Sequence, residues 1–113
     1  MGAKTGAGSR QKGSRWERDV VAYLHGRCWP AAHRTRTPGF EADRGDVGGL
    51  PLVIECKNVE RWSVQEWMRQ AEEAGMRAGL PWCVVAKRPG LPVDEAAVIV
   101  PADLFFTLLE AAS

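Results

Sequence analysis

Hydrophobic and polar positions follow two spacings along the chain, and together they predict eight elements. Apolar residues recur every three or four positions in residues 14–27, 63–78 and 101–112, which indicates three amphipathic helices. Shorter apolar or β-branched runs, separated by turns that contain glycine and proline, indicate strands. These runs cover residues 33–37, 46–47, 52–58, 82–87 and 96–100. The order α-β-β-β-α-β-β-α predicts a single α/β domain in which helices flank a mixed central β-sheet.

Capping signals mark the starts of two of these helices. Ser14 is followed three residues later by Glu17, and Ser63 is followed three residues later by Glu66, as in a capping box. The last helix has apolar positions at helical spacing, and we expect them to face the core. These positions are Leu104, Phe105, Leu108 and Leu109.

Charged residues are distributed unevenly, although the net charge is only +1. Residues 1–40 contain eight Lys or Arg and two acidic residues. Residues 41–113 contain seven Lys or Arg and twelve acidic residues. This asymmetry fits a polyanion-binding protein with a metal site, and it fits a solvated basic tail beside ordinary surface acids equally well. Residues 1–12 have almost no apolar content, so we expect a flexible basic tail there.

Cysteine usage and hydropathy exclude several classes of protein. The three cysteines are widely spaced without a zinc-binding pattern, and Cys56 and Cys83 lie within apolar runs. We therefore expect buried thiols in a reducing cytoplasm, that of a bacterial, archaeal or phage-infected cell. No apolar stretch approaches the length of a membrane span, and we expect no secretory signal. The expected partners include neither a membrane nor an organic cofactor.

Residues 45–58 place charged side chains inside an otherwise apolar strand. Side chains alternate between the two faces of a strand, so Glu55 and Lys57 share one face while Ile54 and Cys56 share the other. An acid and a lysine within an apolar run carry a desolvation cost, which another group has to offset.

The preceding turn offers such a group. If four residues form the loop, Val47 opposes Leu52. Asp46 then opposes Val53 and lies diagonally across from Glu55, on the same face, with about 7–8 Å between the backbone positions. A two-residue loop keeps Asp46 on that face and a three-residue loop turns it away, so the site depends on register.

Two carboxylates and a lysine on one face have a chemical use. The oxygens of Asp46 and Glu55 suit Mg²⁺ or Mn²⁺, and the backbone carbonyl of Cys56, which points sideways from the strand, is a further candidate ligand. Such a cation would activate water and neutralise a phosphodiester, while Lys57 would orient the attacking water or stabilise the transition state. A structural salt bridge between Glu55 and Lys57 is the alternative.

Asp46 followed by Glu55-Cys56-Lys57 resembles the PD-(D/E)XK nuclease superfamily. A wider pattern resembles archaeal-type Holliday junction resolvases over about residues 10–90. This pattern consists of KGSRWERD at the start of the first helix, IECKN in the central strand, Gln70 in the next helix and WCVVAK in the strand after it. Gly45 stands where the name of the superfamily places proline.

The resemblance implies a restriction-endonuclease-like core, here a nuclease domain of residues 13–113. It implies a Mg²⁺-dependent endodeoxyribonuclease, with Mn²⁺ as a substitute, that resolves Holliday junctions by phosphodiester hydrolysis in DNA recombination or repair. Asp46 and Glu55 would be direct metal ligands, Glu17 would help to hold the metal, through water or directly, and Lys57 would be the catalytic lysine. A four-way junction is cut on two strands, so we expect a homodimer. The last helix or the strand near residues 82–86 is its expected interface.

Further residues are assigned from their type and position. Gln70 and Asp43 are secondary candidates for the site, and Glu17 has a purely structural alternative in the capping box with Ser14. Trp62 is expected to stack on a base, to pack on a second subunit or to pack as a staple on its own helix. The expected phosphate contacts are Arg10, Lys12, Arg15, Arg34, Arg36 and Lys87.

Three alternatives to a junction resolvase stay open at this point. The first is another PD-(D/E)XK nuclease, such as a nickase or a repair nuclease. The second is a non-catalytic DNA-binding protein on the same fold, and the third is a small interaction module without a DNA substrate.

Overall fold

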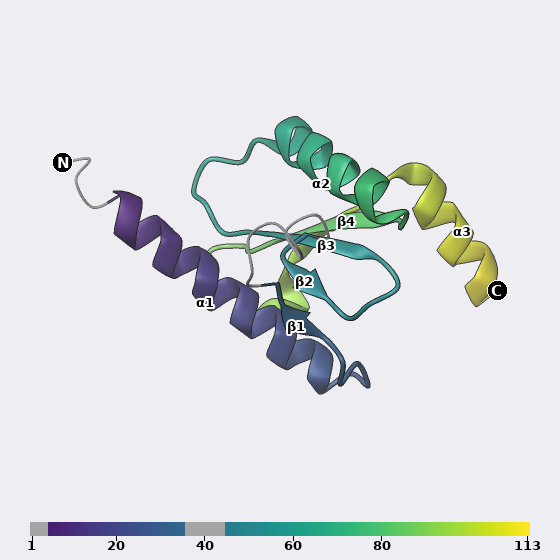
Figure 1. Cartoon of the computed structure of the whole chain (residues 1–113), viewed down its shortest axis with the longest axis horizontal. Helices are drawn as coiled ribbons and strands as arrows, with labels where there is room; N and C mark the ends of the chain where they lie inside the picture. Colours follow the sequence, from purple (N-terminus) through teal and green to yellow (C-terminus); the bar gives the residue numbers. More distant parts are fainter. Residues whose placement is uncertain (1–4, 36–44) are drawn as a thin grey trace.

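A computed structural model describes the backbone of residues 5–35 and 45–113, with side chains from Gln11 onward. This part of the chain contains helices and short strands, and three of the strands follow one another between the first two helices (Figure 1). The elements are α1 (Thr5–His25), β1 (His33–Arg34), β2 (Val47–Gly48), β3 (Val53–Lys57), α2 (Val64–Ala78), β4 (Trp82–Ala86), the 3₁₀ turn η3 (Val93–Glu95), β5 (Ala97–Ile99) and α3 (Ala102–Ala112). Only η3 has no counterpart among the predicted elements.

The five strands form one mixed sheet in the order β1-β2-β3-β4-β5. Strands β3 and β4 are parallel and are joined through α2, whereas the other neighbouring pairs are antiparallel. The parallel pair is the longest, and its register runs from Val53 opposite Trp82 to Lys57 opposite Ala86. The single α/β domain with a mixed central sheet, predicted from the sequence, is confirmed.

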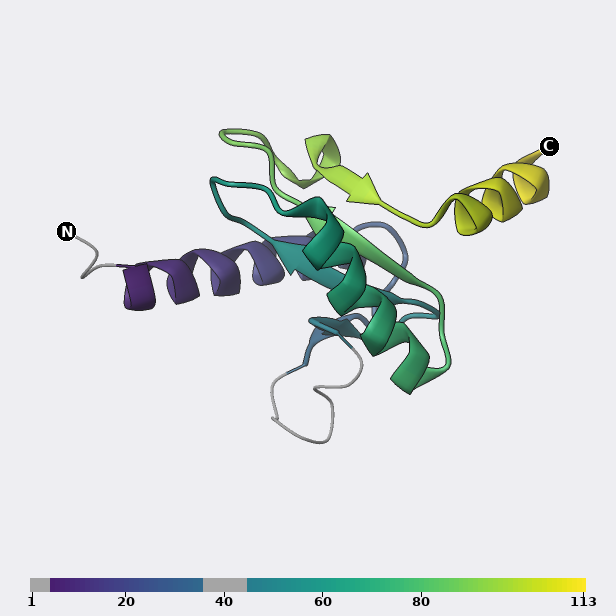
Figure 2. The ribbon, with the colours of Figure 1, turned by 90° about the horizontal axis from the view of Figure 1, so that it is seen from above.

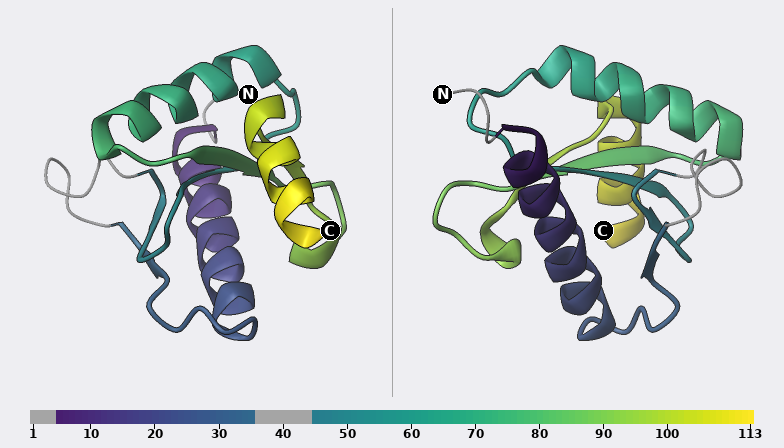
Figure 3. Two further views of the ribbon diagram at one scale, coloured as in Figure 1. Left: turned by 90° about the vertical axis from the view of Figure 1, so that its right-hand side faces the viewer. Right: turned by 60° about the vertical axis from the view of Figure 1, so that its left-hand side comes forward.

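Helices α1 and α2 cover opposite faces of the sheet (Figure 3). The side chain of Val85 packs in the core cluster under α1, whereas Val84 and Ala86 pack in the cluster under α2. The indole of Trp16 is 2% exposed and donates a hydrogen bond to the carbonyl of Val85 at 3.1 Å. Trp16 and Trp67 are therefore core residues, as predicted.

Helix α1 begins at Thr5, well before the predicted start at Ser14, and ends at His25. The capping box expected between Ser14 and Glu17 is therefore wrong, because both residues lie inside the helix. A helix that is already formed extends at low cost, since each further residue adds a hydrogen bond. Residues 5–12, which we expected to belong to a flexible tail, accordingly have helical backbone in the structure.

Helix α2 begins after Ser63, as predicted, but the hydroxyl of Ser63 makes no capping hydrogen bond. Trp62 packs its ring against Trp67 with 5.5 Å between the ring centroids. This contact is the staple that the sequence allowed, and it leaves Trp62 39% exposed. Gly79 ends the helix in the left-handed conformation that favours glycine.

The hairpin before β3 has a register two residues away from the predicted one. Val47 pairs with Ile54 rather than with Leu52. Gly48, which the predicted four-residue loop contained, belongs instead to β2 and pairs with His33, so the turn begins one residue later. Gly49 follows it with a φ of +82°, and a Cβ there would overlap the carbonyl oxygen of Ala31, so only glycine fits at this point. A shift of two residues preserves the face, and Asp46 stays on the side of the sheet predicted for it.

The C-terminal helix α3 projects from the body (Figure 2) and packs against no other element of the described chain over an extended surface. Phe105, Leu108 and Leu109 are each at least half exposed. The expectation that they face the core is therefore wrong for this chain on its own. No helix in the described ranges is long and apolar enough to span a membrane.

Candidate active site

Asp46 lies directly before β2 and reaches across to β3. Its carboxylate oxygen Oδ2 accepts a hydrogen bond from the backbone N–H of Cys56 at 2.8 Å, and its own N–H donates to the carbonyl of Ile54 at 2.8 Å. The N–H and C=O of a strand residue leave the strand on the same edge, so the carbonyl of Cys56 also points toward Asp46. The shifted register places Asp46 opposite Glu55, and the two predicted carboxylates are brought together.

Gly45 sets the backbone that presents Asp46. Its φ is +79°, and a Cβ there would lie 2.7 Å from the side chain of Val53 and 2.8 Å from the carbonyl oxygen of Ile54. Proline cannot adopt a positive φ, so the residue in the name of the superfamily does not fit this turn. Glycine meets both requirements, since it lacks a Cβ and adopts positive φ freely.

Glu55 shares a partly buried space with Asp46. Burial raises the pKa of Glu55 most, and the negative charge of Asp46 and a hydrogen bond with it raise the pKa further, to about 8. The ammonium group of Lys57 lowers the pKa of Glu55 but does not cancel the rise. Glu55 therefore keeps a proton near neutral pH and shares it with Asp46, and a bound cation would displace that proton.

Glu17 on α1 lies at the edge of the same group of carboxylates. Burial and the charge of Asp46 raise the pKa of Glu17, whereas a hydrogen bond with Arg34 lowers it. In this contact Arg34 Nε donates to Glu17 Oε1 at 3.1 Å, and Arg34 Nη2 also donates to Ser14 Oγ at 3.2 Å. Glu17 thus approaches the site without a capping role, and Arg34 holds it there.

The side chain of Lys57 extends from β3 toward α2, where it contacts the side chain of Gln70. The Nζ of Lys57 donates to Gln70 Oε1 at 2.7 Å, and Gln70 Nε2 donates to Glu66 Oε2 at 3.1 Å. Arg69 fixes Glu66 in turn through two hydrogen bonds of 2.5 and 3.0 Å. Gln70, a secondary candidate in the sequence, is therefore in direct contact with the predicted catalytic lysine.

Comparison with protein families decides the class. The chain matches the family described as "Phage putative PDDEXK endonuclease" over residues 8–106. The protein belongs to this family. The nuclease superfamily that Asp46, Glu55 and Lys57 indicated is thereby confirmed.

Other comparisons add little to that assignment. No curated protein matches this chain. Among solved structures, it is similar to Hjc of Archaeoglobus fulgidus, described as a Holliday junction resolvase from an archaeal hyperthermophile. The two are 23% identical, the match covers 89% of this chain and all of that one, and the TM-score is 0.45.

The candidate donor atoms of the site are of the kind that fits a hard divalent cation. In the described part of the chain, no three His, Cys, Asp or Glu side chains gather as a ready-made metal site. The donor set is instead the carboxylates of Asp46 and Glu55 with the carbonyl of Cys56, all oxygen atoms of the kind that Mg²⁺ and Mn²⁺ prefer. The observation in favour of this fit is the close approach of Glu55 to Asp46 in a partly buried space, because two such carboxyl groups share a proton that a bound cation can displace.

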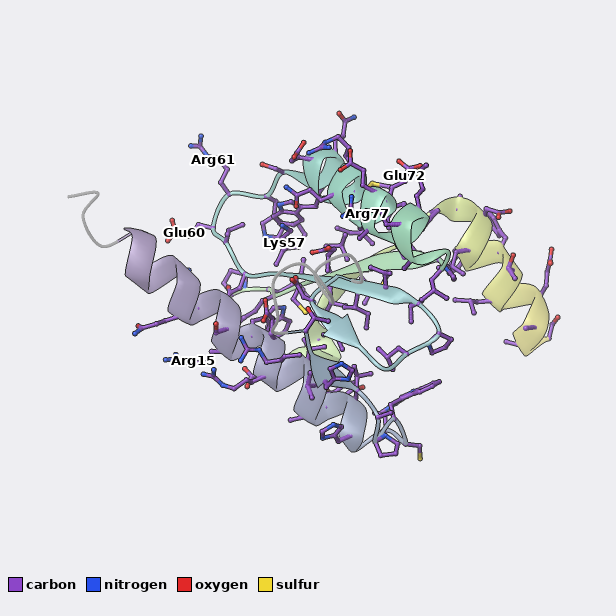
Figure 4. All side chains as sticks on the ribbon, in the orientation of Figure 1. Arg15, Lys57, Glu60, Arg61, Glu72 and Arg77 are labelled. Carbon is purple, nitrogen blue, oxygen red and sulfur yellow. The ribbon has the colours of Figure 1, made fainter. Side chains whose placement is uncertain are left out.

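The residues expected to contact phosphates differ in their surroundings. Lys12 and Arg15 are exposed on α1. Figure 4 shows Arg15 extending from this helix and Arg61 extending from the loop before α2. Lys87 is less free, because its Nζ lies 5.2 Å from the centre of the Trp16 ring and donates to a backbone carbonyl at 2.7 Å. Arg36, Asp43 and the side chain of Arg10 lie outside the described residues.

Two contacts of the site were not predicted. The pairing of Glu17 with Arg34 links residues that are 17 positions apart, and no local pattern indicates it. The contact of Glu66 with Gln70 has a local signal, since residues four positions apart on a helix lie on the same side. The sequence analysis assigned Glu66 to a capping box with Ser63, so its contact with Gln70 was not predicted.

Proposed function

We propose that this protein hydrolyses phosphodiester bonds in branched DNA with the help of Mg²⁺ or Mn²⁺, and that it prefers four-way Holliday junctions. The observation that carries the proposal is the meeting of Asp46 and Glu55 on one side of β3, next to Lys57. Two carboxyl groups this close ionise together only when a cation lies between them, so the space between them suits a divalent ion.

Each residue of the site would have a separate task. Asp46, Glu55 and the carbonyl of Cys56 would hold the cation, and Glu17 would hold it directly or through water. When bound, the cation would neutralise charge on the phosphodiester and make a water molecule more acidic. Lys57 would orient the attacking water or stabilise the extra negative charge of the transition state.

Gln70 supports the task of Lys57. Lysine has a long flexible side chain, and a fixed acceptor reduces the number of positions that its ammonium group samples. The contact of 2.7 Å with Gln70 provides this acceptor within α2, a rigid element.

Substrate binding would rest on the basic side chains of α1. Lys12 and Arg15 are exposed there and would contact phosphates, which give affinity without sequence information. We therefore propose recognition of DNA shape. A four-way junction has two equivalent strands to cut, so two copies of the protein would act on one junction in recombination or repair.

The substrate is tested by comparing a labelled synthetic four-way junction with a linear duplex of the same arm sequence, each with Mg²⁺, with Mn²⁺ and with EDTA. We expect paired cuts near the branch point with either metal and none with EDTA. Equal cutting of the duplex would contradict the junction preference while leaving a general nuclease. Cutting in EDTA would contradict the metal dependence.

A further inference from the structure

The loop between β3 and α2, residues 58–63, exposes a tryptophan close to the candidate active site. The loop starts directly after Lys57, and the side chain of Trp62 is 39% exposed. Val59 and Val64 are 43% and 38% exposed on either side of it. A single exposed apolar side chain is ordinary on a protein surface, whereas a cluster of them indicates a contact surface.

The ring of Trp62 has a fixed position. It packs against the ring of Trp67, which is 5% exposed, with 5.5 Å between the centroids and 51° between the ring planes. The start of the loop is tied to α1, because Asn58 Nδ2 donates a hydrogen bond to the carbonyl of Lys12 at 3.5 Å. A side chain that is already held loses little conformational freedom on binding, so Trp62 is suited to bind a flat ring.

Basic side chains lie on both segments that meet at this loop. Arg61 precedes Trp62, and Lys12 and Arg15 are exposed on the part of α1 that runs beside the loop (Figure 1). Glu60 is the only acidic residue of the loop, and it leaves the loop in a different direction from Arg61 (Figure 4). These charges favour a ligand that carries phosphates next to its flat rings.

The distance from the active site limits which part of a DNA molecule Trp62 reaches. Trp62 follows Lys57 by five positions, and five residues of extended chain span at most about 18 Å. Nucleotides along one strand of a duplex are about 3.4 Å apart along the helix axis. The ring therefore lies within roughly five nucleotides of a phosphodiester bound beside Lys57.

Only a base that has left the stack presents its face to a protein ring. Neighbouring bases cover both faces of each base in an intact duplex, whereas bases at a branch point leave the stack at lower cost. Stacking on an aromatic side chain is favourable for every base, so it distinguishes the structure of DNA and not its sequence. A protein partner at this place would obstruct the approach of DNA to Lys57, which makes DNA the occupant that agrees with a working site.

We propose that Trp62 stacks on an unpaired base near the scissile phosphate, with Arg61 on the adjacent backbone, and so determines the preference for branched over fully paired DNA. This inference rests on the proposed nuclease for its substrate. It deepens that proposal by naming a specificity-determining residue, and Trp62 has no part in the hydrolysis itself.

DNA binding in EDTA, where no cutting is expected, tests the preference. We expect Trp62→Leu to raise the Kd for a four-way junction about 5- to 100-fold and to leave the Kd for a duplex of the same arm sequence unchanged. Leucine keeps an apolar contact with Trp67 but offers no aromatic face. Trp62→Phe keeps the face and should retain most of the junction affinity.

Trp29→Ala is the matched control for these variants. Trp29 is 43% exposed in the turn after α1, at the opposite end of that helix from Lys12, and its replacement should change neither Kd. Circular dichroism and thermal unfolding check that each variant is folded. An equal rise in the Kd for junction and duplex, or no rise in either, would overturn the role of Trp62.

A fluorescent base locates the contact. 2-Aminopurine, whose emission depends on stacking, is placed in turn at each of the positions within about five nucleotides of the branch point. We expect the parent protein and Trp29→Ala to change the emission at the same positions, and Trp62→Leu to leave it unchanged there. The same change in emission with Trp62→Leu would overturn the stacking contact.

Cleavage of the same DNAs in Mg²⁺ or Mn²⁺ separates this inference from the proposed function. Junction binding that depends on Trp62 but leads to no cutting would support the inference and overturn the nuclease. Cutting with the same ratio of junction to duplex in the parent protein and in Trp62→Leu would overturn the inference and leave the nuclease. A change in the sedimentation of DNA-free Trp62→Leu would also overturn it, because Trp62 would then belong to a protein interface.

Discussion

The ammonium nitrogen of Lys57 lies 2.7 Å from the amide oxygen of Gln70. An amide group can present either its oxygen or its NH₂ group, and the carboxylate of Glu66 accepts a hydrogen bond from the NH₂ group. Since Arg69 fixes Glu66, the oxygen of Gln70 is left facing Lys57. A series of hydrogen bonds through Arg69, Glu66 and Gln70 on α2 thus fixes the position of Lys57 on β3.

Replacing Gln70 by alanine tests this series of hydrogen bonds. We expect the turnover rate on branched DNA to fall about 10- to 100-fold, because Lys57 loses its acceptor, while the affinity for DNA stays unchanged. Single-turnover cleavage and a separate binding titration measure the two quantities. Gln65→Ala on the same helix is the control, since Gln65 is exposed, and it should cut at the parental rate. Equal rates for both variants would remove Gln70 from the site.

Gly45 should tolerate no side chain. Gly45→Ala forces a Cβ into contact with Val53 and Ile54 at a positive φ, so we expect a loss of about 2–4 kcal/mol in the free energy of unfolding. Cleavage should fall as well, because the turn that presents Asp46 shifts. Chemical denaturation measures the stability.

Gly90→Ala provides the matched comparison. Gly90 has a φ of +76°, but its Cβ position has no atom within 4 Å. We expect a loss of about 1 kcal/mol from backbone strain alone, with cleavage unchanged. If Gly90→Ala lowered the free energy of unfolding as much as Gly45→Ala, the close contact with Val53 would not be the cause of the destabilisation by Gly45→Ala.

The metal-free protein should lose stability as the pH rises. The pKa of Glu55 is about 8 in the folded protein, whereas an unfolded glutamate titrates near about 4.3. Between these values the folded state binds more protons than the unfolded state, so the free energy of unfolding falls with increasing pH. The stabilisation is fully present below about pH 4 and is lost as the pH passes through about 8.

Thermal unfolding at pH 5 and pH 8.5 in EDTA measures this effect. We expect the free energy of unfolding to fall on the order of 1–3 kcal/mol more in the parent protein than in Glu55→Gln, which has no titrating group at this position. Mg²⁺ should restore part of the loss at pH 8.5. If both proteins show the same pH dependence, Glu55 does not share its proton with Asp46 as inferred.

The strand pattern made the centre of the site predictable. Alternation in residues 52–58 placed Glu55 and Lys57 on one face, and this holds in the structure. The predicted register was wrong by two residues, and Asp46 still lies on the predicted face because side chains alternate with a period of two. The turn at Gly49 lies against the backbone of Ala31, which only the fold brings close, so the sequence could not predict the position of this turn.

Contacts between distant segments were beyond local patterns. Arg34 was expected to contact phosphate, and its pairing with Glu17 depends on how α1 lies against β1. Helical spacing likewise showed that Phe105, Leu108 and Leu109 share one side of α3. It did not show whether the surface that covers them belongs to the same chain.

Cleavage of a labelled four-way junction by the parent protein, Asp46→Asn and Glu55→Gln, with binding measured on the same samples, tests the nuclease site most directly. With Mg²⁺ we expect the parent protein to cut and both variants to bind the junction without cutting it. Normal cutting by both variants would contradict the assignment of Asp46 and Glu55 as the metal-holding carboxylates.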